Sequence, residues 1–526
     1  MTLHVPCEIS IPACAALLLH AVVLRRFEVD HFTLRLCVTS LAVHIAFAFA
    51  FGLTTATTTA ASFFGTLTAV ILIYRAFLHP LRQFPGPFAA RLSKWWTVGQ
   101  ILRSDFRYHK SVVPRLGRKY GDYVRTGPRE LLVFDVAAVN AVLGFGSRAG
   151  KGPFYDSFER SLHLTRDRTW HRQRRQVWDT GLKQLLADFE PRLRTCAEEL
   201  VEKIRRVGAE PVPLNEYYMY FAYDVMATLA FGTPMGFNAG VASEEGKRVL
   251  AIMEDGLSVL AALASVPWFL NTVAGATQEL GPLAQWTAWN RARLVERQVM
   301  QNPKPDLMQY LLDVTPRGPA GDLDLLGECR LIIGAGSETS ASTLVFILVL
   351  LGVHVEYQTA LREELDATEA FSARNAHPLL DAVITETLRL WPALFWATQR
   401  VAPPEGLRMN NIFIPSGTIV AIPGWSLARD ERNFVRPEEW IPERWTSRPE
   451  LCVNRAASMP FSTGPYSCAG RELAMLQIRS VVARIVREFE VVLPEGFDER
   501  AFFDGVQDRI TAAVPKVQIK FVPLDV

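Results

Sequence analysis

The first 83 residues constrain the fold most, because they are too apolar to form the surface of a water-soluble domain. They carry eight charged side chains and contain three apolar runs, at about residues 9–24, 36–53 and 60–77. The second and third runs have the length of a helix that spans the hydrocarbon core of a bilayer. The shorter first run also fits the apolar core of a cleaved signal peptide, although no small-x-small cleavage site follows it. The sequence therefore predicts that residues 1–83 form a membrane region with one to three transmembrane helices.

Arginine residues border these runs unevenly. Five of them flank the segment between the first two runs or follow the third run: Arg25, Arg26, Arg35, Arg75 and Arg82. The segment 54–59, between the second and third runs, has no charge and is expected to form a loop. Because basic residues remain on the cytoplasmic side, this distribution fits three spans with a lumenal N-terminus and a cytosolic remainder. A single anchor formed by the third run is the simpler alternative.

A short connector, Phe-Pro-Gly-Pro, follows at residues 84–87. Proline lacks a helix donor and restricts the residue before it, so we expect a stiff hinge here. Residues 88–526 contain no repeat, low-complexity tract or long linker. Amphipathic stretches with helical spacing dominate, and short Val- and Ile-rich runs are few. The helical stretches include 186–207, 288–300 and 356–367, and the strand-like runs are 123–133, 401–422 and 514–522. The predicted fold class is mainly α with small β-sheets, in one domain over 88–526 that follows N-terminal transmembrane helices.

Charge and cysteine content argue against two classes of protein. Lys and Arg total 56 against 54 Asp and Glu, so the bulk charge indicates no nucleic-acid partner. The seven cysteines are odd in number, scattered, and without a Cys-x-x-Cys pair. They therefore indicate no disulfide scaffold and favour a reducing compartment.

One cysteine lies in a sequence that suits a metal ligand. Cys468 is flanked by glycines in the segment 461–470, Phe-Ser-Thr-Gly-Pro-Tyr-Ser-Cys-Ala-Gly, and an amphipathic helix is expected from Arg471 to Glu488. The dipole at a helix N-terminus favours a thiolate, and glycines let the backbone approach a flat cofactor. Such a thiolate is an axial ligand for heme iron. A buried structural cysteine is the alternative interpretation.

Further short motifs occur in a fixed order along the chain. They are Ala-Gly-Ser-Glu-Thr-Ser at 335–340, Glu-x-x-Arg at 386–389 continued to Pro392, Pro-Glu-Arg-Trp at 442–445, and the cysteine segment 461–470. From about residue 85 to the C-terminus, the chain thereby resembles the cytochrome P450 heme-thiolate monooxygenases. The resemblance implies the cytochrome P450 fold and a heme b cofactor with Cys468 as the axial iron ligand, contacted also by Phe461. The implied oxidoreductase activity inserts one oxygen atom from O2 into a lipophilic organic substrate.

The motif 335–340 lies within an apolar segment, 331–351, that is long enough to span a bilayer. A central Glu338 is costly in lipid, so a long helix buried in the protein is the better interpretation. By the resemblance, Glu338 and Thr339 are catalytic and deliver protons during oxygen activation, which is general acid catalysis. Gly336 is expected to loosen the helix at this point.

Two alternative functions are distinguished by this acid–alcohol pair. An oxygen-independent isomerase or dehydratase of the same fold usually lacks the pair, whereas this chain has Glu338 and Thr339. A non-enzymatic membrane heme protein would not need the pair either.

Three other charged residues have a structural role by the resemblance. Glu386 and Arg389 lie one helical turn apart, and with Arg444 they are expected to form a buried triad. Removing one member of such a triad would leave an uncompensated buried charge.

Two registers are open for the helix that holds the heme propionates in this family. The candidate pairs are Trp170 with Arg174 and His171 with Arg175, of which the second is slightly favoured. Arg400 resembles a further propionate ligand. Where the family usually has a basic residue, two positions before Cys468, this chain has Tyr466. One propionate contact is therefore expected to be lost or changed.

Basic residues on the same helix resemble the docking face for an electron donor. They are Arg168, Arg172, Arg174, Arg175 and Lys183. Since no flavin or NADPH fingerprint occurs in the sequence, electrons are expected from a separate NADPH-cytochrome P450 reductase. The implied location is the endoplasmic reticulum membrane, with the catalytic domain in the cytosol.

The substrate pocket can be outlined only by resemblance. The candidate lining segments are 152–164, the loops around 231–237, 394–398 and 509–513. Phe395 and Trp396 indicate a bulky, apolar pocket. The general style of the sequence resembles filamentous fungal members of the family, which often act in secondary metabolism.

Overall fold

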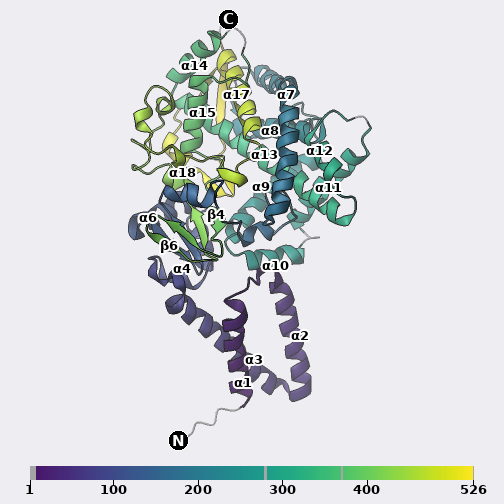
Figure 1. Ribbon diagram of the computed structural model, residues 1–526. Coiled ribbons are helices and arrows are strands. Elements are labelled where there is room, and N and C mark those ends of the chain that lie inside the picture. The colour runs from purple at the N-terminus through teal and green to yellow at the C-terminus, as the bar shows by residue number, and fades with distance from the viewer. Residues whose placement is uncertain (1–6, 278–280, 302, 369–370, 525–526) are drawn as a thin grey trace.

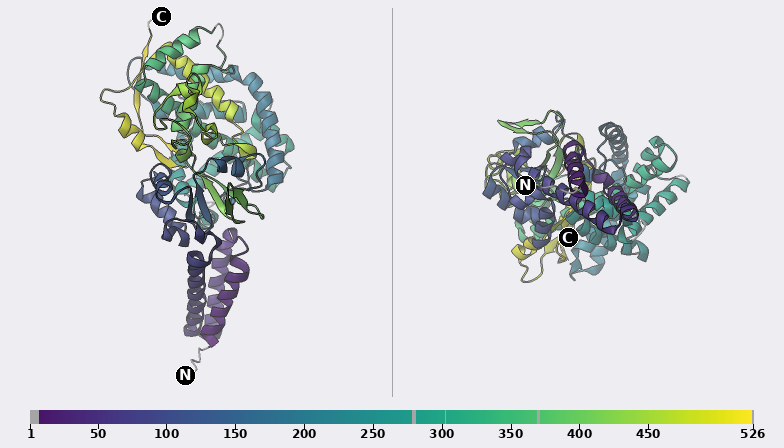
Figure 2. Two further views of the ribbon diagram at one scale, coloured as in Figure 1. Left: turned by 60° about the vertical axis from the view of Figure 1, so that its left-hand side comes forward. Right: turned by 90° about the horizontal axis from the view of Figure 1, so that it is seen from below.

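Three N-terminal helices project from one end of a much larger helical domain (Figure 1). The computed structural model describes residues 7–277, 281–301, 303–368 and 371–524. The projecting helices are α1 (Cys7–Leu18), α2 (Thr33–Phe51) and α3 (Leu53–Ile73). They lie side by side, and the N-terminal end of α1 is remote from the domain (Figure 2).

The described residues contain four helical stretches that are long and apolar enough to cross a membrane, judged by length and composition. They are Cys7–Leu24, Thr33–Phe51, Leu53–Leu78 and Pro319–Val353. In each of the first three stretches, 11% or less of the most apolar 18-residue segment is buried inside the protein. In the fourth stretch, 78% of that segment is buried. The expectation that 331–351 forms a helix buried in the protein is therefore confirmed.

The predicted loop at 54–59 is wrong, because α3 already begins at Leu53. Gly52 alone separates α2 from α3, and its φ of +86° is accessible to glycine at little cost. Inside α3, the hydroxyl groups of Thr57 and Thr58 donate to the carbonyls of Leu53 and Thr54 at 2.8 and 2.9 Å. These bonds satisfy the threonine hydroxyls within the helix, so a polar segment can remain helical.

The turn between α1 and α2 is attached to the large domain by charged groups. The Glu28 carboxylate pairs with Arg129 and, at 2.6 Å, with Arg166. Asp30 lies 3.4 Å from the same Arg129 guanidinium. The projecting helices are therefore held by ionic contacts as well as by the covalent connector.

That connector packs against the domain. The Pro85 carbonyl accepts a hydrogen bond from the Arg125 backbone at 2.7 Å. A Cβ atom on Gly86 would lie 2.2 Å from the Arg125 carbonyl oxygen, so only glycine allows this approach. The segment 84–87 is thus fixed by its contacts with the first strand.

Helices make up most of the large domain. They are α4 (Phe88–Leu92), α5 (Trp95–Arg103), α6 (Val113–Tyr120), α7 (Arg168–Val207), α8 (Leu214–Phe231), α9 (Glu244–Leu263), α10 (Pro267–Thr277), α11 (Gly281–Val299), α12 (Leu307–Val314), α13 (Pro319–Val353), α14 (Glu356–Asp366), α15 (Pro378–Leu390), α16 (Gly424–Leu427), α17 (Arg471–Glu488) and α18 (Glu499–Gly505). The main hydrophobic core surrounds α13, which packs against α8, α15 and α17.

The strands are short. They are β1 (Tyr123–Gly127), β2 (Glu130–Val133), β3 (Val212–Pro213), β4 (Thr398–Val401), β5 (Leu407–Met409), β6 (Ile412–Ile414), β7 (Ile419–Ile422), β8 (Phe489–Val492), β9 (Gln507–Arg509), β10 (Thr511–Ala513) and β11 (Gln518–Pro523). The largest sheet has the order β1-β2-β7-β4, in which β2 and β7 run parallel and the other pairs run antiparallel. The prediction of a mainly helical chain with small sheets is confirmed.

Candidate cofactor site

Cys468 lies at the end of a tightly folded loop, three residues before α17. Its backbone amide donates to the Phe461 carbonyl at 2.9 Å, which closes the loop. Gly464 has a φ of +73°, and a Cβ atom there would lie 1.9 Å from the Leu143 carbonyl oxygen. Glycine is therefore required at 464 for both conformation and space. The loop directs the Cys468 side chain into open space, where it is exposed.

The surroundings of the Cys468 thiol act on its pKa in opposite directions. Burial raises the pKa of Cys468, because desolvation outweighs the hydrogen bond from Gly470 and the charges of Arg175 and Arg471. Coordination to a metal ion deprotonates a thiol outright. A metal cofactor bound at Cys468 would therefore favour its thiolate form.

One face of α13 also lies against open space in the middle of the domain. Ala335 is exposed and Thr339 half-buried, although Ser337, Glu338 and Ser340 between and beside them are buried. The Thr339 hydroxyl donates to the Ala335 carbonyl at 2.8 Å. The helix thus presents a small methyl group and a hydroxyl group to a space that protein atoms do not fill.

The Glu338 carboxyl group has a specific hydrogen-bond partner. It is 8% exposed, and its Oε2 accepts from the Thr511 hydroxyl at 2.7 Å. The acid and the alcohol of the predicted pair therefore lie in one helical turn, with the acid held by a distant strand.

Gly336 packs α13 closely against α8 instead of loosening it. A Cβ atom at 336 would lie 2.3 Å from the Met226 methyl group. The helix continues as α-helix through this position. The expected loosening is therefore absent, and the glycine is needed for close approach of two helices.

Side chains with basic groups gather around the Tyr466 ring, two residues before Cys468. The ring centroid lies 4.7 Å from Lys151 Nζ, 4.8 Å from Arg400 Cζ and 4.5 Å from the His171 ring centroid. Arg175 Nη1 donates to the Ser467 carbonyl at 2.7 Å. Three segments far apart in sequence thus bring basic groups to the cysteine loop.

Two cations of this cluster, Lys151 and Arg400, have no salt bridge among the described residues, whereas Arg175 pairs with Asp179 at 2.7 Å. Lys151 and Arg400 are 4% and 3% exposed. Among the described residues, the Lys151 ammonium group donates only to the carbonyls of Leu162 and His163. The Arg400 Nε atom has no hydrogen-bond partner among these residues. Burial, together with the charge of Arg400, lowers the pKa of Lys151 to about 7. Burial and then Lys151 lower the pKa of His171 to about 3.

These features together fit a heme. Buried charges are normally paired, so the cations beside Tyr466 suit the carboxylates of heme propionates. The exposed thiol of Cys468 suits the iron, and the glycine-rich loop suits the close approach of a flat ring.

The chain's match to a protein family agrees with this fit. The model of the family described as cytochrome P450 matches residues 90–521. The chain belongs to the cytochrome P450 family. Similar fungal proteins include the cytochrome P450 monooxygenase orf5 of Eupenicillium brefeldianum, 36% identical over 86% of this chain and 93% of that protein. Tryprostatin B 6-hydroxylase of Aspergillus fumigatus is 34% identical over 86% of this chain and 82% of its own length. The monooxygenase sthD of Phaeosphaeria nodorum is 33% identical over 89% of this chain and all of its own length.

The two registers on α7 of this cytochrome P450 have different surroundings. His171 and Arg175 approach Tyr466 and Ser467, as described above. Trp170 instead stacks between Arg160 and Arg174. Arg174 is buried and lies 3.1 Å from the Glu328 carboxylate. Arg174 therefore cannot be part of the expected docking face for an electron donor. Arg172 and Lys183, two other residues expected on that face, are exposed.

The three residues expected to form a triad are in direct contact. Arg389 donates two hydrogen bonds of 2.8 Å to Glu386, and Arg444 Nε donates a third of 2.8 Å. All three side chains are completely buried. Burial alone would raise the pKa of Glu386, but the two arginines hold it below its usual value. Trp445 Nε1 also donates to Glu386 at 2.9 Å, which connects the triad to the Pro-Glu-Arg-Trp motif.

Sequence reasoning missed Lys151. It lies between two glycines, and Gly150 pairs with Val401, the neighbour of Arg400. A lysine between glycines has no distinctive spacing to any other basic residue. Only the pairing of residues 150 and 401, about half the chain apart, brings its ammonium to Tyr466.

Proposed function

We propose that this cytochrome P450 monooxygenase uses heme b to insert one atom of O2 into a lipophilic organic substrate, with electrons from NADPH through a separate reductase. The observation that carries the proposal is the exposed Cys468 thiol beside Lys151 and Arg400, two buried cations that have no salt bridge among the described residues. The names of the fungal relatives, two of them monooxygenases and one a hydroxylase, support the same reaction class. By the same likeness, a role in fungal secondary metabolism is proposed.

Each residue of the site has a distinct task. Heme, when bound, supplies the iron at which dioxygen is activated. Cys468 would bind that iron through its sulfur, and the Phe461 carbonyl holds the cysteine backbone in place. His171, Arg175 and Arg400 would hold the propionates, with Lys151 in addition.

Glu338 and Thr339 would move protons on the other side of the cofactor. The Thr339 hydroxyl donates to Ala335, so its oxygen remains able to accept a proton or a water. Glu338 is an acid one residue away whose buried carboxyl is expensive unless it has a task.

Thr339→Ala tests the proton-delivery role. We expect nearly unchanged heme content and ligand-induced spectra, but about fivefold less product per NADPH, with the missing electrons recovered as hydrogen peroxide. The measurement is product, peroxide and NADPH in one assay reconstituted with a reductase. Thr343→Ala, one turn further along α13, is the control and should retain coupling. Unchanged coupling in Thr339→Ala would contradict the proton-delivery role of this hydroxyl group.

Lys151→Met tests the role of the buried ammonium group. A charged hydrogen bond contributes about 1.5–3 kcal/mol, so heme should leave the purified holoprotein about ten- to hundredfold faster. The measurement is the rate of heme transfer to excess apomyoglobin. Lys151→Arg should retain heme, and Lys183→Met on the exposed face of α7 should behave as the wild type. Equal transfer rates for Lys151→Met and wild type would remove Lys151 from the site.

We further propose that α1, α2 and α3 cross the endoplasmic reticulum membrane, with a lumenal N-terminus and a cytosolic catalytic domain. The three helices are apolar, little buried and side by side. The charged turn at Glu28 would then lie at the cytosolic surface, where Arg129 and Arg166 pair with it.

A glycosylation acceptor tests this topology. An Asn-x-Thr acceptor in a short extension before Met1 should be modified in microsomes, because three spans place it in the lumen. The same acceptor introduced at the exposed segment 316–318 should remain unmodified. An unmodified N-terminal acceptor would instead favour a single anchor.

A further inference from the structure

The hairpin of β9 and β10 connects a buried polar cavity to Glu338. Asp508 on β9 pairs in register with Ala512 on β10, next to Thr511. The Thr511 hydroxyl donates to Glu338 on α13 at 2.7 Å. The hairpin thus has one strand at the cavity and the other at the predicted proton-delivering acid.

The hairpin is too short to hold its own position. Each strand has three residues, and isolated two-stranded hairpins are at best marginally stable. The turn residue Ile510 has a φ of +74°, which is strained for a β-branched side chain. Such strain persists only where the surroundings determine the conformation. The position of Thr511 must therefore come from contacts outside the hairpin.

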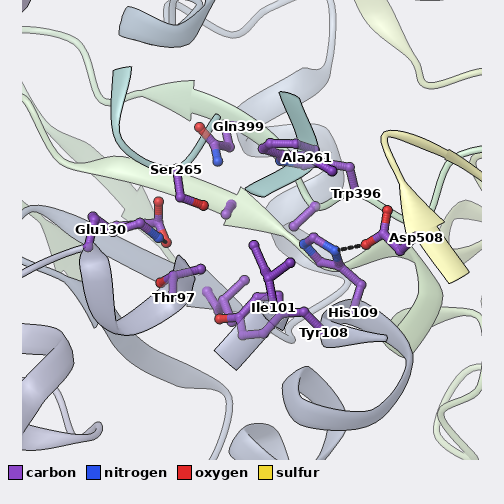
Figure 3. A pocket seen from close by; sticks show the side chains of 14 residues that line it. Thr97, Ile101, Tyr108, His109, Glu130, Ala261, Ser265, Trp396, Gln399 and Asp508 are labelled. Atoms are coloured by element: carbon purple, nitrogen blue, oxygen red, sulfur yellow. Dashed lines mark hydrogen bonds and ion pairs between the residues drawn. The ribbon is translucent and has the colours of Figure 1, made fainter. Parts of the chain in front are cut away.

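Those contacts lie on both strands. The Asp508 backbone donates to the Phe106 carbonyl at 2.6 Å, and the Ala512 backbone donates to the Ala393 carbonyl at 2.8 Å. The Asp508 side chain pairs through Oδ2 with His109 Nδ1. In Figure 3 the His109 ring and the Asp508 carboxylate face each other at one end of the cavity.

The cavity beside the His109–Asp508 pair leaves little room for water. The cavity has a volume of about 20 Å³, which is room for one water molecule. Aromatic walls of Tyr108 and Trp396 lie beside the pair. Asp508 is 6% exposed, so bulk water does not compete for its bond with His109. The other carboxylate oxygen, Oδ1, has no hydrogen-bond partner among the described residues.

We propose that Thr511 is a positioning residue for Glu338, and that the His109–Asp508 pair holds the hairpin so that Thr511 reaches it. A buried carboxyl group with a fixed hydrogen bond has a fixed direction, whereas a mobile acid delivers protons less efficiently. This inference rests on the proton-delivery role of Glu338 in the proposed function. It adds a long-range contact, across 173 residues, that sets the direction of the acid.

The test uses holoprotein with carbon monoxide as a probe of the site. The infrared stretch of carbon monoxide on the reduced protein reports polar groups beside it and needs no substrate. We expect Thr511→Val, which keeps the shape and removes the hydroxyl, to broaden or split this band. Thr511→Ser should restore the single wild-type band. His109→Phe should broaden the band in the same way, because the hairpin loses its side-chain anchor.

Further arms separate this inference from the proposed function. Glu338→Gln should shift the band, because it replaces the acid that the proposed function puts beside the probe. A shift with Glu338→Gln but a wild-type band with Thr511→Val would overturn the inference and leave the proposed role of Glu338 intact. A wild-type band with Glu338→Gln would overturn both. A wild-type band with His109→Phe alone would remove the anchor from the proposal. Unchanged visible absorbance of the carbon monoxide complex shows that each variant is folded and correctly ligated.

Discussion

Cys468→Ala should abolish both the thiolate band of the reduced, carbon monoxide-bound protein and all turnover. The Phe461–Gly470 loop directs this single sulfur into open space, whereas Cys196 and Cys329 are buried. No cluster of three or more His, Cys, Asp or Glu that could hold a metal ion is found in the described part of the chain. Without the Cys468 sulfur, heme iron would lose the thiolate that the reduced spectrum reports. The measurement is the difference spectrum of membranes that contain equal amounts of the protein.

Two further variants separate ligation from folding in this experiment. Cys468→His keeps a ligating atom, so it should retain heme while it loses the thiolate band. Cys452→Ala changes a free, half-buried cysteine outside the Phe461–Gly470 loop and should retain the band. A thiolate band in Cys468→Ala would contradict the assignment of the iron ligand.

Glu386→Gln should cause the second large loss, in the amount of folded holoprotein. The substitution keeps the side-chain shape but leaves Arg389 and Arg444 as buried charges without a counter-ion. Such a broken buried pair costs about 3–5 kcal/mol, which is a large share of a typical free energy of unfolding. The thermal midpoint and the yield of carbon monoxide-binding protein are the measurements.

The control for this variant is Glu202→Gln, which breaks a surface pair with Arg205 and Arg206. Exposed pairs contribute little, so its yield should match the wild type. An equal yield for Glu386→Gln would show that the triad is not needed for folding.

The same triad gives the stability a defined pH dependence. The pKa of Glu386 is lower in the folded chain than its usual value. Its contribution to the free energy of unfolding is therefore complete above the usual carboxyl pKa and is lost as pH falls through the lowered one.

Short motifs made the cysteine loop and the Glu386–Arg389 pair predictable, whereas Arg444, 58 residues from Glu386, was predictable only from the family resemblance. Glu386 and Arg389 lie one turn apart, so any helix brings them together. The segment Arg471–Glu488 was expected as a helix and forms α17 with the same bounds.

Contacts between distant segments could not be predicted. The two registers on α7 differ by one residue, or about 100° around the helix, and only the packing of α7 determines which pair approaches Tyr466. The approach of Lys151 depends on the pairing of Gly150 with Val401. The bond from Thr511 to Glu338 depends on a hairpin whose own sequence has no metal or acid motif.

The cation cluster beside Tyr466 links the lifetime of the chain to the supply of its porphyrin. Before loading, Lys151 and Arg400 are buried together without an anion among the described residues, so the empty chain carries an unbalanced electrostatic cost. A ligand that binds only the native state adds about 4 kcal/mol of stability at a thousandfold excess over its Kd. Newly synthesised chains that wait for heme should therefore be degraded preferentially. The cellular abundance of this cytochrome P450 should then rise and fall with porphyrin synthesis even at constant transcript level.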